Sequence, residues 1–172
     1  MNRIMFPALA TLSLVLACSP CWAVTCQHGI PPSNPDEVYV DHGDGTVTDS
    51  RTGLMWKRCG EGQSWSSGTC SGTASIHTWS AALALAEAAS FAGHGDWRLP
   101  NFRELRGLVE ECRAQPAIND SVFPNTSTTK FWSGSPDANY SGASWGVDFD
   151  VGVPSNGSRS ASGRVRLVRA GQ

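Results

Sequence analysis

The stretch Asp96-Trp97-Arg98-Leu99-Pro100-Asn101 decides the predicted fold, because it joins two helical segments in the middle of the chain. Asn101 is a favourable N-cap, and Glu104, three residues on, completes a capping-box-like pair. A helix is therefore expected to begin directly after Asn101. Its buried stripe is predicted to be Phe102, Leu105, Leu108, Val109 and Cys112, with Arg103, Arg106, Glu110 and Arg113 mostly outside it.

The segment before this stretch predicts a first helix over residues 78–90. It is rich in alanine, which has the highest helix propensity. Trp79, Leu83 and Ala86 follow the helical repeat and make one apolar stripe. Gly93 and Gly95 are expected to end the helix.

Short strands are expected on both sides of the helices. On the N-terminal side they cover residues 38–40, 46–48 and 54–57, with turns at 41–45 and 49–53. On the C-terminal side they are 131–133, 144–151 and 164–169, with a polar loop over 152–163. In the second of these, Trp145, Val147, Phe149 and Val151 alternate with polar or small residues and are predicted to face inward. Central helices between antiparallel strands indicate an α+β fold with neighbouring termini.

Residues 1–23 are predicted to be a cleavable signal peptide. Arg3 precedes an apolar run over 4–17, and Ala23 is a suitable small residue at the cleavage point. The run is shorter than the ~20 residues of a membrane-spanning helix. A retained anchor and a lipid anchor at Cys18 are the alternatives. Residues 24–37 follow as a proline-containing extended leader, and residues 38–170 as one domain.

Four cysteines remain after cleavage, and they predict two disulfides in an oxidising compartment. Cys59 and Cys70 bracket a Gly/Ser-rich loop and form the natural local pair. Cys26 is then expected to pair with Cys112. A zinc site is not favoured, because the mature chain has no C-x-x-C spacing.

Composition excludes nucleic acid as a partner. The 172 residues carry a formal net charge of −2, or −3 once Arg3 is removed, and no stretch is strongly basic. A smaller basic patch that binds sulfated or carboxylated glycans is one hypothesis. Its members would be Arg103, Arg106, Arg113, Arg164, Arg166 and Arg169. The favoured alternative is a solvated face that nearby glutamates balance.

Two further side chains are binding candidates. Trp65 lies in the polar loop between Cys59 and Cys70, where an exposed ring suits sugar or protein recognition. The alternative, that it packs over the core, stays open. Arg98 is either a ligand-binding cation or, as favoured, a structural residue that stacks on Trp97 and bonds to carbonyls or to a carboxylate such as Asp96.

Metal binding and catalysis have little support. Oxygen ligands for Ca²⁺ are offered by Asp41, Asp44, Asp148 and Asp150, but their spacing is not that of a known calcium loop and Asp before Gly is common in turns. Calcium is therefore only a weak alternative, and no cofactor is expected. None of the mature chain's histidines stands in a nucleophile motif, so an enzyme is not expected.

Six ordered motifs resemble the Lcl (Legionella collagen-like) C-terminal domain family, which was long described as a domain of unknown function. They are residues 44–49, 52–56, 96–101, 116–119, 131–133 and 165–169. The resemblance implies a secreted or surface-exposed bacterial domain related to the C-type lectin-like fold. The family's name-giving member carries this domain at the end of a collagen-like adhesin, whereas this sequence has no Gly-X-Y tract.

The expected function is an exported binding module, adhesin-like or lectin-like, that recognises a glycan or a surface protein. A structural subunit of an exported assembly is one alternative, and oligomerisation stays open. A degenerate relative of the formylglycine-generating enzymes is another. Those enzymes use a C-terminal cysteine pair, and this sequence has no cysteine after Cys112.

Overall fold

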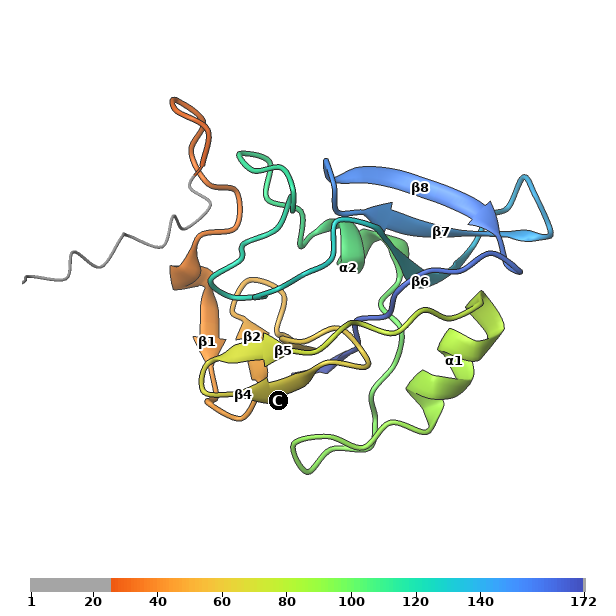
Figure 1. Cartoon of the computed structure of the whole chain (residues 1–172), viewed down its shortest axis with the longest axis horizontal. Coiled ribbons are helices and arrows are strands. Elements are labelled where there is room, and N and C mark those ends of the chain that lie inside the picture. The colour runs from red at the N-terminus through yellow and green to blue at the C-terminus, as the bar shows by residue number, and fades with distance from the viewer. Residues whose placement is uncertain (1–25, 172) are drawn as a thin grey trace, which may run out of the picture.

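The computed structural model describes residues 26–171, and the predicted signal peptide with Cys18 lies outside that range. One sheet joins the two ends of the described chain in the order β1-β2-β3-β9, with antiparallel neighbours (Figure 1). Its strands are β1 (Tyr39–Asp41), β2 (Thr46–Asp49), β3 (Leu54–Lys57) and β9 (Val168–Ala170). The last predicted strand, residues 164–169, is therefore only partly a strand.

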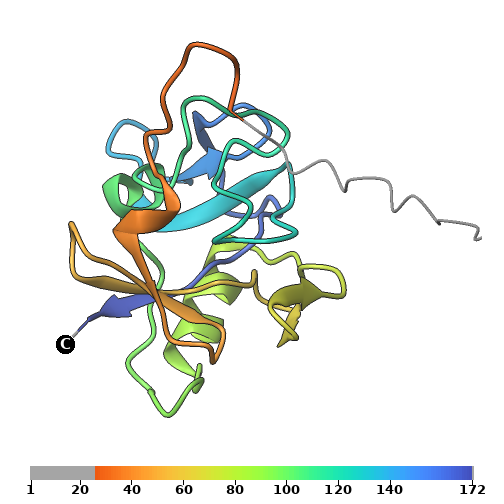
Figure 2. The ribbon, with the colours of Figure 1, turned by 90° about the vertical axis from the view of Figure 1, so that its left-hand side faces the viewer.

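A second sheet lies in the other half of the molecule (Figures 1 and 2). It consists of β6 (Lys130–Pro136), β7 (Ala143–Asp148) and β8 (Val153–Ser158), paired in that order. The polar loop predicted over 152–163 is wrong, because β8 occupies half of it. The segment between Cys59 and Cys70 also contains regular structure, the hairpin of β4 (Ser64–Ser66) and β5 (Thr69–Ser71).

The inward alternation predicted for residues 144–151 is only partly correct. Val147 and Phe149 are fully buried, but Val151 is 56% exposed and lies beyond the end of β7. Ser144, expected on the polar side, is buried, and its hydroxyl lies 3.0 Å from the Arg159 Nε, which donates to it. A hydrogen-bonded serine is stable inside a sheet where periodicity alone predicts solvent.

Both helices form, but they are shorter than predicted. Helix α1 (Trp79–Glu87) buries Ala82 and Ala86, whereas Leu83 faces solvent, which corrects the expected stripe. Helix α2 (Phe102–Arg106) has the expected capping box: the Asn101 side chain accepts from Glu104 N–H, and Glu104 accepts from Asn101 N–H. The chain leaves the helix at Gly107, so Leu108, Val109 and Cys112 are buried but not helical.

The core consists of two clusters. One lies between α2 and the strands and includes Trp56, Leu105, Ile118, Phe131 and Phe149. The other lies under α1 and includes Ala82, Trp97, Leu99, Trp132 and Leu167. Helices and strands thus share one interior, and the fold is α+β.

Two disulfides join Cys26 to Cys112 and Cys59 to Cys70, with Cα–Cα distances of 4.8 and 5.4 Å. Both pairings are the predicted ones. The first ties the leader to the segment after α2, where Gln27 N–H also donates to the Cys112 carbonyl. The leader is less extended than predicted, because it contains a turn at residues 28–29, a bend at 33–34 and a 3-10 helix, η1 (Asp36–Val38). Over residues 26–171, no helix has the length and apolarity needed to cross a membrane.

Candidate functional site

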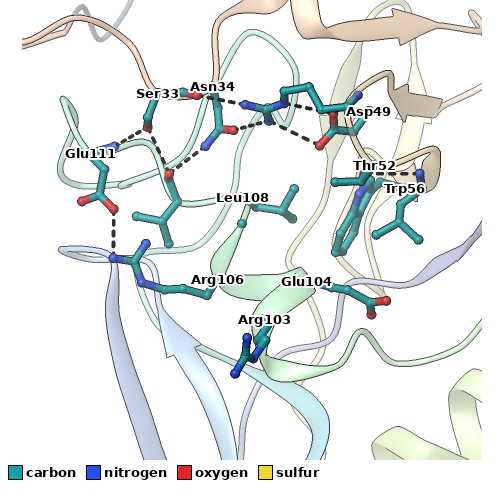
Figure 3. A pocket seen from close by; sticks show the side chains of 14 residues that line it. Ser33, Asn34, Asp49, Thr52, Trp56, Arg103, Glu104, Arg106, Leu108 and Glu111 are labelled. Carbon is teal, nitrogen blue, oxygen red and sulfur yellow. Dashed lines mark hydrogen bonds and ion pairs between the residues drawn. The ribbon is translucent and has the colours of Figure 1, made fainter.

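A cleft of about 570 Å³ opens where three parts of the chain meet (Figure 3). One wall is α2 with the segment after it, the second is the turn between β2 and β3 with both strands, and the third is the leader. The lining residues are Ser33, Asn34, Asp49, Arg51, Thr52, Leu54, Trp56, Arg103, Glu104, Arg106, Gly107, Leu108, Val109 and Glu111. The cleft therefore depends on segments far apart in sequence.

The floor of the cleft is apolar. Leu54 and Trp56 come from β3, and Leu108 and Val109 from the segment after α2. Trp56 is 1% exposed, and its indole N–H has no hydrogen-bond partner in the described part of the chain. A buried donor without a partner is uncommon in folded proteins. The floor is thus hydrophobic, and the unsatisfied donor of Trp56 is itself buried.

The leader wall is held by Glu110, which is 1% exposed. Its carboxylate accepts from Ser33 N–H at 2.8 Å, from the Ser33 hydroxyl at 2.9 Å and from Asn34 N–H at 2.8 Å. Burial raises the pKa of Glu110, but these hydrogen bonds outweigh it and leave the pKa below its usual value. The sequence prediction placed Glu110 outside the buried stripe and is wrong, because a fully bonded carboxylate is stable inside.

Arg51 connects the leader to the turn after β2. Its guanidinium donates to Asn34 Oδ1 at 2.6 Å and to the Ser33 carbonyl at 3.1 Å, and pairs with Asp49 at 3.2 Å. Sequence reasoning did not identify Arg51. The Asp-Ser-Arg turn resembles many surface turns, and its partners in the leader are 17 to 18 residues away.

Glu104 lies at the cleft edge and is held from two sides. It caps α2, and it pairs with Arg98 through two bonds of 2.7 and 2.9 Å. Burial raises the pKa of Glu104, but the Arg98 guanidinium and the Asn101 N–H lower it below its usual value. Arg98 therefore has the structural role that was favoured, but with Glu104 as partner. Asp96 pairs instead with Arg169 at 2.7 Å.

Two predicted binding residues, Arg103 and Arg106, do line the cleft (Figure 3). Arg106 pairs with Glu111 at 2.9 Å. The Arg103 guanidinium has no hydrogen-bond or ion-pair partner among residues 26–171. Arg103 is thus the guanidinium of this cleft that is available to a ligand.

In the other half of the predicted basic patch, Arg166 and Arg169 are buried and Arg164 is only partly exposed. Arg166 is fully buried beside the Phe123 ring, and it donates to the Lys57 and Arg58 carbonyls and to the Thr126 hydroxyl. Desolvation lowers its pKa to about 9. Arg164 donates to the Thr129 hydroxyl and the Ala74 carbonyl. The predicted grouping of Arg164 and Arg166 with Arg103 and Arg106 as one ligand-binding patch is therefore wrong.

Trp65 lies on β4 and is partly buried. The Arg58 guanidinium stacks 4.2 Å from its ring centre. With Gly45 and Phe91 it lines a second, smaller pocket of about 300 Å³. The ring is therefore neither fully exposed nor part of the main core, and it lies outside the lining of the larger cleft.

The calcium candidates act mainly in turns. Asp44 accepts from Thr46 N–H at 2.9 Å, and Asp148 from Asp150 N–H at 2.9 Å. Asp41 accepts from Gly43 N–H and pairs with Arg58 at 2.6 Å. One cluster with metal-ligand atoms occurs in the described residues, at Cys26, Glu110 and Cys112, and both its sulfurs belong to a disulfide. These contacts supply no built metal site.

Among the histidines, His77 has the closest approach to a hydroxyl, with Nε2 2.7 Å from Ser75 Oγ. That hydroxyl also donates to the Glu61 carbonyl at 3.0 Å. Within residues 26–171, no carboxylate hydrogen bonds to His77, so the acid of a catalytic triad has no counterpart here.

Comparison with known proteins adds a family. No curated protein matches the chain. The family model described as the Lcl C-terminal domain matches residues 45–169, a range that holds β2 to β8, the first two residues of β9 and most of the cleft lining. All six motifs of the resemblance begin within or one residue before this range. The chain belongs to the Lcl C-terminal domain family.

Proposed function

We propose that this chain is an exported binding module, adhesin-like or lectin-like, and that the cleft beside α2 is its recognition site. The observation that carries the proposal is an apolar floor together with the Arg103 guanidinium at the edge, which has no partner in the described chain. Ligand sites in proteins are typically concave and mostly apolar, with a few polar groups that set orientation.

The surroundings of the cleft support a preformed site. The Cys26–Cys112 disulfide, the Glu110 hydrogen bonds and the Arg51 bridge fix the leader wall. The capping box and Arg98 fix the start of α2. A preformed site loses less conformational entropy when a ligand binds.

Export is supported by the two disulfides together with the predicted signal peptide, because such bridges form in oxidising compartments. A relation to the C-type lectin-like fold is part of the proposal and rests on the family resemblance. Activity of the formylglycine-generating type is not proposed, since no cysteine follows Cys112.

The test is a binding screen with the mature chain against arrayed glycans and immobilised surface proteins. A ligand of the cleft is expected to lose at least 10-fold in affinity with Arg103→Gln, while the matched variant Arg113→Gln, outside the cleft lining, leaves affinity unchanged. The wild type and the two variants must also have the same unfolding curve, so that a loss of affinity cannot come from a loss of stability. If ligands bind Arg103→Gln as tightly as the wild type, or if neither array yields a ligand, the cleft is not the recognition site.

A structural subunit is the second candidate function. Val151, in the turn between β7 and β8, is 56% exposed, and Val153, the first residue of β8, is 47% exposed. Tyr140, in the segment between β6 and β7, is 65% exposed. Exposed apolar side chains suit burial against another protein. Analytical ultracentrifugation of the mature chain with Val151→Asn tests whether this end of the sheet associates.

A further inference from the structure

We infer that the cleft takes a protein segment in which a large apolar side chain stands next to a carboxylate. This inference rests on the proposed function and names the partner class. The apolar side chain would occupy the floor, and the carboxylate would pair with Arg103. Three properties of the cleft support it: the chemistry of the floor, the volume, and the balance of charge at the edge.

The floor favours a hydrocarbon over a sugar. A saccharide ring carries a hydroxyl on most of its carbons, and each hydroxyl that leaves water needs a hydrogen-bond partner. Leu54, Leu108 and Val109 have no polar side-chain atom, and the single polar side-chain atom of Trp56 is buried. A leucine, isoleucine or phenylalanine side chain loses no hydrogen bond on this floor and gains about 25 cal/mol for each Å² that it buries.

The volume suits a short segment. About 570 Å³ lies within the range of pockets that enclose small organic ligands, about 300–1,000 Å³. A pocket of this size can accept one large side chain and the backbone on either side of it.

The charge at the cleft edge favours a ligand with a single carboxylate. Arg51 and Arg106 are paired with Asp49 and Glu111, and Glu104 is paired with Arg98. Arg103 has no such partner in the described chain, so the edge carries one uncompensated positive charge. A single carboxylate matches it through a two-bond pair. A densely sulfated polymer would need several unpaired cations, which this edge does not supply.

The experiment begins with a displayed library of random hexapeptides, selected on the immobilised mature chain. Selected peptides are expected to share an Asp or Glu next to Leu, Ile or Phe. Replacing that acid by its amide, or the apolar residue by Ala, should weaken each synthetic peptide at least 10-fold. Arg103→Gln in the protein should have the same effect, and Arg113→Gln should have none.

The indole N–H resonance of Trp56 reports directly on occupancy of the floor. It should shift on titration with a selected peptide and stay unshifted with glucuronic acid or a sulfated disaccharide. Peptides without the acidic–apolar pair, or peptides indifferent to Arg103→Gln, overturn the inference. A Trp56 shift with the sugars and none with peptides overturns it while leaving the proposed function standing. If no probe shifts the Trp56 resonance, both this inference and the proposed function are contradicted.

Discussion

Two groups of arginines look alike in the sequence and differ in the molecule. Arg166, near the C-terminal end, is fully buried and donates to three oxygens of the chain itself. Arg103, on α2, lies at the edge of an open cleft and donates to no described residue. One guanidinium is part of the interior, and the other is available for recognition.

The difference shows that the balance of partners, and not the number of charges, identifies a binding group. The buried side chains of Arg166 and Glu110 make several hydrogen bonds within the chain, although the Arg166 Nε has no partner among the described residues. A buried polar group that lacks a partner costs its full desolvation free energy. Groups at the edge of a site can lack partners at little cost, since water replaces them. Four variants, ordered from the interior to the cleft edge, test this contrast.

The largest effect is expected for Arg166→Ala. The change leaves the Lys57 carbonyl and the Thr126 hydroxyl without their donor and opens a cavity beside Phe123. The expected loss is about 3 to 5 kcal/mol of unfolding free energy. Urea denaturation followed by tryptophan fluorescence measures it. A loss below about 1 kcal/mol would show that Arg166 is not an interior anchor.

Glu110→Gln is expected to cost about 2 kcal/mol at neutral pH, because an amide cannot accept all the hydrogen bonds that the charged carboxylate accepts from Ser33 and Asn34. The folded-state pKa of Glu110 is depressed, so its contribution is full above the ordinary carboxyl pKa of about 4.3. It disappears as pH falls through the lower folded pKa.

The measurement for Glu110 is the gap in stability between wild type and Glu110→Gln from pH 7 down to pH 3. The gap should be constant above about pH 5 and narrow below the ordinary carboxyl pKa of about 4.3. A gap that widens with acid would mean that Glu110 is protonated in the folded protein.

Asn101→Ala is expected to have an intermediate effect, about 1 kcal/mol. It removes the side-chain oxygen that caps Glu104 N–H, but the Arg98 pair still holds Glu104 in place. Thermal unfolding by circular dichroism measures the loss. Asn101→Asp is the matched control, because aspartate caps a helix equally well and should retain the stability.

Arg103→Gln is expected to change the unfolding free energy least, by less than about 0.5 kcal/mol. No described residue loses a partner in this variant. The same denaturation experiment applies, and the Arg106→Gln variant, which separates Glu111, is the comparison. A large destabilisation by Arg103→Gln would remove the distinction between the two groups of arginines.

Local signals in the sequence predicted the local structure well. Asn101 and Glu104 indicated the start of α2, the Asp-Gly turn indicated the first hairpin, and the spacing of cysteines indicated both disulfides. Strand β8 could not be found in this way. It contains Pro154 and Gly157 and no apolar alternation, and its order comes from backbone pairing with β7.

Only some of the cleft residues could be predicted from the sequence, for a similar reason. Arg103 and Arg106 were candidates because they lie on the predicted polar face of α2. Arg51 and the orphan donor of Trp56 depend on which distant segments come together, and no local pattern carries that information. The burial of Arg166 likewise depends on carbonyl groups more than 100 residues away.

The position of β9 has a consequence for how the chain reaches this state. Residues 168–170 complete the sheet beside β3, one of the first strands to be synthesised, and Arg98 N–H and the Val168 carbonyl join this strand to the middle of the chain. Pairings between such distant segments form late, since a long loop must close first. During synthesis, one flank of β3 therefore stays open until residues 168–170 have emerged, and a chaperone could bind there.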